Sequence, residues 1–131
     1  INKSNLKYIG FGGFGNQVRD VIHVYDVCEL ILEQIKKINK IYNKTFNAGG
    51  GLNNSISLKE LTVRSRKITR NNINIGKIAK TSNYDIPYFV TDNKKIYSYY
   101  QWRVKRNLDT IINDTFKILS KYQKLFKRNE L

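Results

Sequence analysis

The chain has 131 residues, enough for one ordinary domain or for part of a larger protein. Apolar residues make up 40% of it, which excludes a wholly disordered chain, and no apolar run approaches the ~20 residues of a membrane-spanning helix. One cysteine, Cys28, excludes a disulfide framework, and together with a single histidine it excludes an ordinary zinc site. The chain contains no Met and begins with Ile1, so we expect a fragment or a processed product.

The formal net charge of +14 favours anionic partners such as phosphates, nucleotides, nucleic acid or an acidic membrane surface. The many Ile, Asn and Lys residues offer a second explanation, since all three have AT-rich codons and part of the excess charge follows from a biased genome.

The first predicted elements are a short strand at 6–9, a glycine-rich turn at 10–15 and a β-type run at 17–24. The glycine spacing matches a dinucleotide-binding fingerprint. That fingerprint needs a helix after its last glycine, and a β-type run follows here. We therefore predict a glycine-rich hairpin.

A helix is predicted from Asp26 to about Asn39. Glu29 lies three residues after Asp26, so the pair is expected to form a capping box. Cys28 lies next to the apolar side and is expected in the core, and His23 is expected to be a packed structural histidine. The apolar side consists of Val27, Leu30, Ile31, Ile35 and Ile38.

Further along, residues 45–48 are predicted as a short buried strand that runs into a glycine loop at 49–51. Ser57 and Glu60 have capping-box spacing and open a helix over residues 57–68.

The last third of the chain is predicted to hold an edge strand at 72–80 and an extended segment at 86–91. Asp92 is expected to cap a short helix that runs through Tyr100, and a final helix covers 108–126. The alternation of strands and helices indicates the α/β class.

Three sets of side chains allow both a chemical and a structural interpretation, and we favour the structural one. The carboxylates, interpreted mainly as helix caps and solvated positions, are Asp85, Asp92, Asp109 and Asp114. The aromatics, interpreted as core residues rather than a base-stacking surface, are Tyr97, Tyr99, Tyr100 and Trp102. The basic residues of the tail, interpreted as a solvated helix face, are Lys117, Lys121, Lys124, Lys127 and Arg128.

Arg19 is the strongest candidate for chemistry. An arginine just after a glycine loop can direct two donors at a diphosphate. The alternative is a surface arginine that pairs with Asp20.

Three stretches together resemble the NAD-dependent sugar-nucleotide epimerases of the extended short-chain dehydrogenase/reductase superfamily, over about residues 6–120. The likeness is greatest to the branch that acts on CDP-paratose. The stretches read Gly12-Gly13-x-Gly15-x-Gln17-x-Arg19-Asp20-Val21-Ile22-His23-Val24-x-Asp26, Phe46-Asn47-x-Gly49-Gly50 and Asp85-Ile86-Pro87-x-x-x-Thr91-Asp92.

This resemblance implies an α/β fold: the C-terminal portion of an NAD(P)-binding Rossmann-type enzyme with its small substrate-binding α/β lobe. Residues 1–56 would hold the last Rossmann strands, a helix and the substrate loop, and residues 57–131 the substrate-binding lobe and the C-terminal helix.

The implied activity of the intact enzyme is C2 epimerisation of a nucleotide-diphosphate sugar through a 2-keto intermediate, in O-antigen sugar synthesis. NAD would take the hydride and return it. The family's Tyr-x-x-x-Lys pair is absent from this chain, so we expect this fragment alone to be inactive and NAD to be bound mainly by an N-terminal part. The intact enzyme is expected to be a cytoplasmic homo-oligomer without membrane or nucleic-acid partners.

The resemblance also implies site residues. It assigns Arg19 to the diphosphate, places Gln17 in the same loop and sets Phe89 beside the hexose. It assigns no catalytic, cofactor-binding or metal-binding residue to this chain.

The chain departs from the family pattern in three places, the first of which is Tyr25, where the family often has a second Asp. Ser82 stands where related galactose epimerases carry a second phosphate-binding arginine, with Lys80 as a conceivable substitute. Gln101 and Val104 replace the Gly and Pro of a Gly-Trp-x-Pro turn, which predicts a strained or rebuilt turn. These departures leave open an inactive remnant of such an enzyme. The net charge of +14 and the mixture of Tyr, Trp and Lys residues leave open a basic nucleic-acid-binding module.

Overall fold

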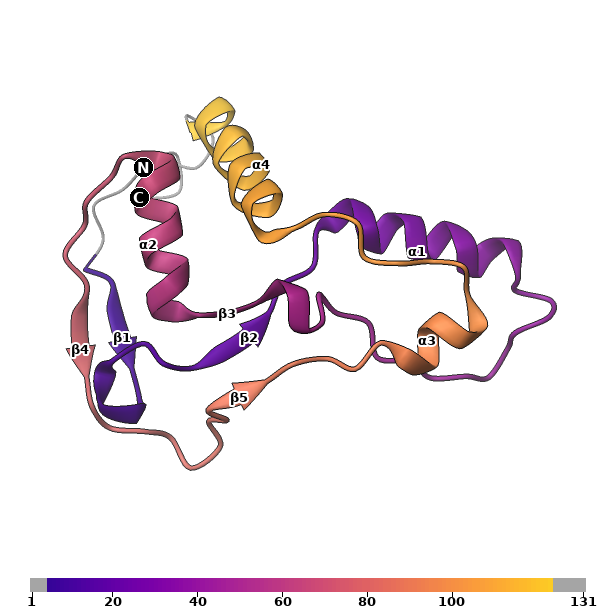
Figure 1. Ribbon diagram of the computed structural model, residues 1–131, viewed down its shortest axis with the longest axis horizontal. Coiled ribbons are helices and arrows are strands. Elements are labelled where there is room, and N and C mark those ends of the chain that lie inside the picture. Colours follow the sequence, from indigo (N-terminus) through magenta and orange to yellow (C-terminus); the bar gives the residue numbers. More distant parts are fainter. Residues whose placement is uncertain (1–4, 124–131) are drawn as a thin grey trace, which may run out of the picture. The chain divides into compact units, whose positions relative to one another are not determined.

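A computed structural model describes residues 5–123 of the chain, which form two compact units (Figure 1). The first unit comprises residues 5–17, 57–87 and 109–123 of the described chain, and the second comprises 18–56 and 88–108. The helices are α1 Val24–Lys36, α2 Leu58–Thr69, α3 Lys94–Tyr99 and α4 Leu108–Lys121, with short 3-10 turns at Phe11–Gly13 and Leu52–Asn54. The strands are β1 Lys7–Ile9, β2 Val18–Asp20, β3 Ser55–Ser57, β4 Gly76–Ile78 and β5 Tyr88–Phe89.

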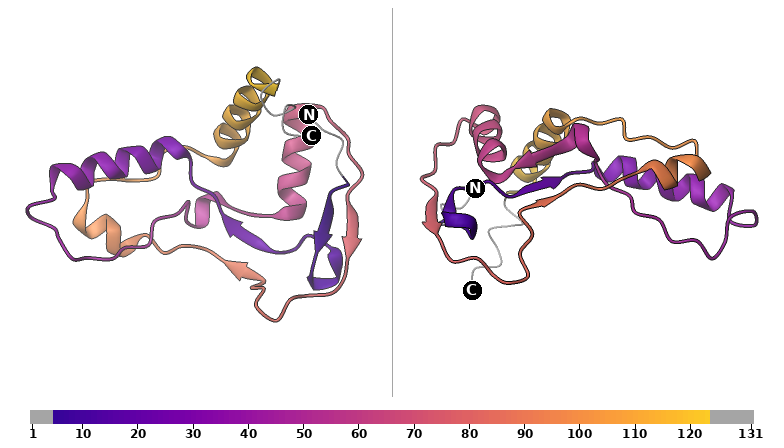
Figure 2. Two further views of the ribbon diagram at one scale, coloured as in Figure 1. Left: turned by 180° about the vertical axis from the view of Figure 1, so that it is seen from behind. Right: turned by 60° about the horizontal axis from the view of Figure 1, so that its bottom comes forward.

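In the first unit β1 pairs with β4 in parallel, with Lys7 opposite Gly76 (Figure 2). The predicted hairpin is wrong, because β1 and β2 lie in different sheets. The glycine tract instead continues the pairing with β4, since the amide of Gly10 donates to the carbonyl of Ile78 at 2.8 Å. Gly10 has φ of +82°, a conformation that glycine adopts without steric cost and that lets the chain turn here.

The helices of the first unit match their sequence signals. Ser57 and Glu60 form the predicted capping box at the start of α2, and these hydrogen bonds lower the pKa of Glu60. The apolar sides of α2 and α4 line a groove of about 250 Å³. Arg64 and Asp109 join the two helices at 2.8 Å. The described part of α4 confirms the predicted helix, whereas Phe126 and the tail beyond residue 123 lie outside the described residues.

The second unit carries a sheet in the order β3-β2-β5 and the larger hydrophobic core. Strands β2 and β5 are parallel, with Val18 opposite Tyr88 and Arg19 opposite Phe89. The buried core cluster consists of Leu30, Ile96, Tyr100 and Trp102. Parallel strands interleaved with helices confirm the α/β class.

Helix α1 begins differently from the prediction. Its N-cap is His23, which is buried and whose Nδ1 accepts the amide of Tyr25 at 3.1 Å, as suits a packed structural histidine. Asp26 is therefore not the cap, and it makes no capping box with Glu29. Cys28 is exposed rather than in the core, because it lies on the face of α1 opposite Leu30.

Residues 45–48 form no regular secondary structure and pair with no strand among the described residues, so the predicted buried strand is wrong in the structure. The segment is anchored by the side chain of Phe46, which is half-buried and packs against the core cluster.

The turn that lacks the family's Gly and Pro is rebuilt rather than strained. Tyr100 ends α3 in an extended conformation, and Gln101 is not among the described residues with positive φ. The guanidinium of Arg103 donates to the carbonyl oxygens of Trp102 at 2.6 Å and Tyr100 at 3.2 Å. The last carbonyl groups of a helix have no hydrogen-bond partner within the helix. Arg103 supplies such a partner here, where the family's turn would use a glycine.

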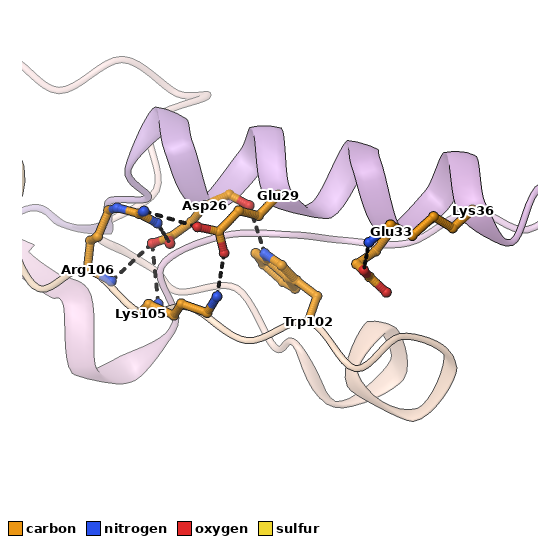
Figure 3. Close-up of polar contacts among 7 residues, drawn as sticks. All are labelled: Asp26, Glu29, Glu33, Lys36, Trp102, Lys105 and Arg106. Atoms are coloured by element: carbon orange, nitrogen blue, oxygen red, sulfur yellow. Dashed lines mark hydrogen bonds and ion pairs between the residues drawn. The ribbon is translucent and has the colours of Figure 1, made fainter.

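A buried carboxylate ties α1 to the segment after this turn (Figure 3). Asp26 is fully buried and forms an ion pair with the guanidinium of Arg106. It also accepts the amides of Lys105 at 3.4 Å and Arg106 at 3.1 Å. The indole of Trp102 donates to the carbonyl of Asp26 at 2.7 Å. These contacts fasten the first turn of α1 to the residues that follow Trp102.

Glu29 extends this network at its exposed edge. Its carboxylate pairs with Lys105 at 2.6 Å and with Arg106 at 3.0 Å. Hydrogen bonds from Lys105, and then from Arg106, lower the pKa of Glu29 below its ordinary value of 4.5, and the pKa of Arg106 is raised in turn.

Leu30 and Leu32 provide a matched test of the core. Leu30 is buried and Leu32 is 56% exposed, two positions away on the same helix. We expect Leu30→Ala to lower the free energy of unfolding by about 2–5 kcal/mol, and Leu32→Ala by less than about 0.5 kcal/mol. Urea unfolding followed by circular dichroism measures both, and equal losses would show that the core is misplaced.

Glu29 is expected to make stability depend on pH. Its folded pKa lies below 4.5, so its contribution is present above that pH and is lost as the pH falls through the folded value. Glu29→Gln should therefore flatten the loss of stability below pH 4.5, as measured by urea unfolding between pH 3 and 6. High salt should shrink the difference between the two proteins, because the pair is partly exposed. Identical pH profiles would contradict the assignment.

Candidate functional site

The candidate site lies where β2 and β5 run side by side in the second unit. Arg19 and Phe89 occupy directly opposite positions in the parallel pair. Opposite residues of neighbouring strands project from the same face of a sheet, so the guanidinium and the aromatic ring belong to one surface. Phe89 is 53% exposed and Arg19 is half-buried, with its Nη1 donating to the carbonyl of Val18 at 2.7 Å.

Asp20, next to Arg19, fixes the end of β2. Its carboxylate accepts the amide of Gly51 at 2.9 Å and the hydroxyl of Thr91 at 3.3 Å. The first bond reaches the glycine loop, and the second reaches the segment that continues β5. One side chain therefore holds three backbone segments in place beside Arg19 and Phe89.

Asn93 holds the same loop from another direction. Its buried amide accepts the N–H of Gly49 at 3.1 Å and donates to the carbonyl of Gly49 at 2.9 Å. These two hydrogen bonds take the place of the backbone pairing that a neighbouring strand would provide, since no strand in residues 5–123 pairs with Gly49. Gly49 tolerates no side chain, because a Cβ there would lie 2.7 Å from the Cβ of Thr91.

A cavity of about 620 Å³ opens beside this loop, within the second unit. Its wall includes the loop itself together with Thr91, Asn93, Tyr97 and Arg106. Arg106 is committed to Asp26 and Glu29, so its role in the wall is structural.

Gln17, the third predicted site residue, is the last residue of the first segment of the first unit. It is buried, and its side-chain nitrogen donates to the carbonyl of Ile9. Its Oε1 is buried without a hydrogen-bond partner within residues 5–123. The structure thus uses the nitrogen of this amide to hold the end of β1, directly before the glycine tract.

The glycine tract does not fit a dinucleotide. The 3-10 turn Phe11–Gly13 lies within the tract, and the next element is the strand β2 rather than the helix that a dinucleotide fingerprint needs. The amides of Gly10 and Gly12 already bind the carbonyls of Ile78 and Ala79. Within the described ranges no three His, Cys, Asp or Glu side chains come together as a metal site. No helix in residues 5–123 is long and apolar enough to cross a membrane.

The aromatic cluster is largely interior, as predicted. Tyr100 and Trp102 are buried, and Tyr97 packs against them. Tyr99 is partly exposed and contacts the ring of Phe46 at 5.0 Å. Most of these rings are thus engaged in the core, in agreement with the favoured interpretation.

Sequence reasoning did not identify Asn93 and Arg106, and it weighed Asp20 only as a partner of Arg19. Asp20 carried a usable signal, since an acidic residue adjacent to a candidate anion-binding arginine needs a partner of its own. Asn93 and Arg106 carried none, because their partners lie 44 and 80 residues away in the chain.

The chain is similar in sequence to nucleotide-sugar epimerases. It is 33% identical over 93 residues to the CDP-paratose 2-epimerase of Salmonella typhi, a match of 71% of this chain and 27% of that protein. It is 28% identical over 123 residues to the UDP-glucose 4-epimerase of Mycoplasma genitalium, covering 86% of this chain and 36% of that protein. No protein-family model matches the chain.

Solved structures share the fold. A crystal structure of a UDP-glucose 4-epimerase superposes with a TM-score of 0.77 at 25% identity, over 89% of this chain and 37% of that one. A Stenotrophomonas maltophila UDP-glucose 4-epimerase with bound NAD and formylated UDP-arabinopyranose gives 0.78 at 20% identity, over 92% and 36%.

The chain spans about a third of the length of these relatives. It is homologous to part of the nucleotide-sugar epimerases and has a partial Rossmann-like α/β fold of the extended short-chain dehydrogenase/reductase type.

Proposed function

We propose that this chain is the substrate-binding part of an NAD-dependent nucleotide-sugar epimerase, with CDP-paratose as the first candidate substrate. The observation that carries the proposal is the placement of Arg19 opposite Phe89 on the β2–β5 pair. Sequence similarity to two epimerases, one acting on CDP-paratose and one on UDP-glucose, supports the same substrate class.

Arg19 is proposed to bind the diphosphate. A guanidinium presents parallel N–H donors in a fixed fork that matches phosphate oxygens. Binding would require Nη1 to exchange the carbonyl of Val18 for a phosphate oxygen. Each charged hydrogen bond of this kind contributes about 1.5–3 kcal/mol.

Phe89, in the second unit, and Gln17, in the first unit, are proposed as two further and separate contacts. The half-exposed ring of Phe89 offers an apolar face for the hexose next to the diphosphate. For Gln17, the amide oxygen is the atom that would meet the nucleotide, because its nitrogen binds the carbonyl of Ile9.

NAD, which would supply the hydride chemistry, does not fit the described residues of this chain. The glycine tract is used for β-pairing, and the family's Tyr-x-x-x-Lys pair is absent from the sequence. We therefore propose that the chain alone binds substrate without turning it over, and that the intact enzyme is a cytoplasmic homo-oligomer.

An inactive remnant is the second candidate, and the structure weakens one argument for it. The altered turn at Gln101 and Val104 is folded, with Arg103 bound to its carbonyls. Ser82 remains the substantial departure, since its hydroxyl cannot replace a phosphate-binding guanidinium.

Arg19→Ala tests the proposal directly. We expect the 131-residue chain to bind CDP and Arg19→Ala to weaken binding by about 10- to 100-fold, which corresponds to the loss of one charged hydrogen bond. Isothermal titration calorimetry with CDP and UDP measures the affinities and also ranks the two bases.

Arg64→Ala is the matched control, because it removes an equal charge from a guanidinium that pairs with Asp109. It should leave CDP binding within about twofold, since long-range charge effects are screened by salt. Equal losses for the two variants, or no binding of CDP or UDP by the wild-type chain, would refute the assignment.

A further inference from the structure

A second cavity, of about 410 Å³, lies within the first unit and is lined by α2, the β1–β4 pair and the glycine tract (Figure 1). Tyr8 and Lys77 are directly opposite each other in the parallel pair, so their side chains project from one face of it. The hydroxyl of Tyr8 donates to Thr62 Oγ1 at 2.7 Å and thereby joins this face to α2. None of the residues proposed to bind the nucleotide sugar lines this cavity, so it is a separate site.

The wall of this cavity carries three cations and, within residues 5–123, no carboxylate. The cations are Lys59 and Arg66 from α2 and Lys77 from β4. Lys59 and Arg66 are seven positions apart and therefore lie on the same face of α2. Among the described residues no carboxylate pairs with any of the three, whereas Arg64 on the same helix pairs with Asp109. Like charges that share a cavity repel one another, so a bound anion would stabilise this arrangement.

Arg66 has donors that the protein does not use. Its Nη2 donates to the carbonyl of Ile73, and its Nε is buried without a hydrogen-bond partner within residues 5–123. A buried donor that lacks an acceptor destabilises the folded state. A small rotation of the guanidinium toward the cavity would let a phosphate oxygen accept from Nε, and a guanidinium binds phosphate through two parallel N–H groups.

Apolar side chains adjoin these cations. Phe14 is 55% exposed and Val63 is 59% exposed, and both line the cavity. The ammonium of Lys77 lies 4.9 Å from the centroid of the Phe14 ring. Small-molecule sites in proteins have volumes of about 300–1,000 Å³, and this cavity falls in that range. The arrangement suits a ligand that carries both an anion and an apolar group.

We propose that this cavity binds a small phosphate ester. Lys59, Arg66 and Lys77 would hold the phosphate, and the organic group would pack against Phe14 and Val63. A small molecule fits better than a nucleic acid, because the cations converge on one cavity, whereas a polynucleotide needs a charged groove along which successive bases stack.

The probe is phenyl phosphate, a phosphate ester with one aromatic ring, titrated into the ¹⁵N-labelled 131-residue chain. About 0.15 M NaCl in a phosphate-free buffer screens non-specific attraction. We expect saturable shifts of the amide resonances of Phe14, Lys59 and Lys77. We also expect phenyl phosphate to bind at least about fivefold more tightly than inorganic phosphate, because its ring removes apolar surface from water.

Three lysine substitutions separate the cavity from the general charge of the chain. Lys59→Gln and Lys77→Gln should each raise the Kd for phenyl phosphate about tenfold or more, through the loss of a charged hydrogen bond. Lys67→Gln is the matched control, because Lys67 is an exposed cation on α2 that does not line the cavity. It should leave the Kd within about twofold. Circular dichroism checks that all three variants fold as the wild type does.

Four results would overturn the inference. They are the absence of saturable binding by the wild-type chain, equal affinities for phenyl phosphate and inorganic phosphate, equal losses in the three lysine variants, and tighter binding of a single-stranded oligonucleotide that depends on Lys59 and Lys77. Arg19→Ala should leave the Kd for phenyl phosphate within about twofold. Failure of the proposed function looks different, because it appears as CDP binding that ignores Arg19→Ala.

Discussion

The buried carboxylate of Asp26 is the constraint on which the second unit depends. It lies without exposure in the first turn of α1 and receives the guanidinium and the amide of Arg106, 80 residues along the chain. Burying a carboxylate is costly, and its partners offset that cost without creating a large net gain. The pair instead selects one arrangement of α1, because any packing that separates α1 from residues 105–106 leaves a charge buried and unpaired.

The contacts of Asp26 also position residues of the hydrophobic core and of the cavity wall. Trp102 donates its indole N–H to the carbonyl of Asp26, and this hydrogen bond fixes the position of the largest ring of the core along α1. Arg103 then turns the chain by binding the carbonyls at the end of α3. The residues that follow, Lys105 and Arg106, form part of the cavity wall beside the glycine loop.

The sheet of the second unit needs side chains to hold it. Its strands have two or three residues each, fewer than the usual five or six, so their ladders contribute few hydrogen bonds. Asp20 and Asn93 compensate by bonding the backbone of Gly49 and Gly51. The register of Arg19 against Phe89 is thus maintained by the side chains of neighbouring residues as much as by the strands themselves.

Local signals in the sequence predicted local structure well. The capping box of Ser57 and the apolar periodicity of α2 and α4 depend on residues three or four apart, and the structure confirms them. The predicted hairpin failed because parallel pairing of β1 with β4 joins residues 69 apart, such as Lys7 and Gly76, and leaves no local signal. Cys28 and Asp26 were misplaced for one shared reason: apolar residues on both faces of α1 hid which face is buried.

The net charge of the chain says less about its ligand than the placement of single residues does. A net charge of +14 attracts phosphates of every kind, so it selects no ligand class by itself. Several of the cations are held in ion pairs, including Arg64, Lys105 and Arg106. A guanidinium and an exposed ring on neighbouring strands, which lie about 4.8 Å apart, offer a more selective pattern. A nucleotide sugar joins a diphosphate directly to a sugar ring, and that adjacency of anion and ring is what Arg19 opposite Phe89 would recognise.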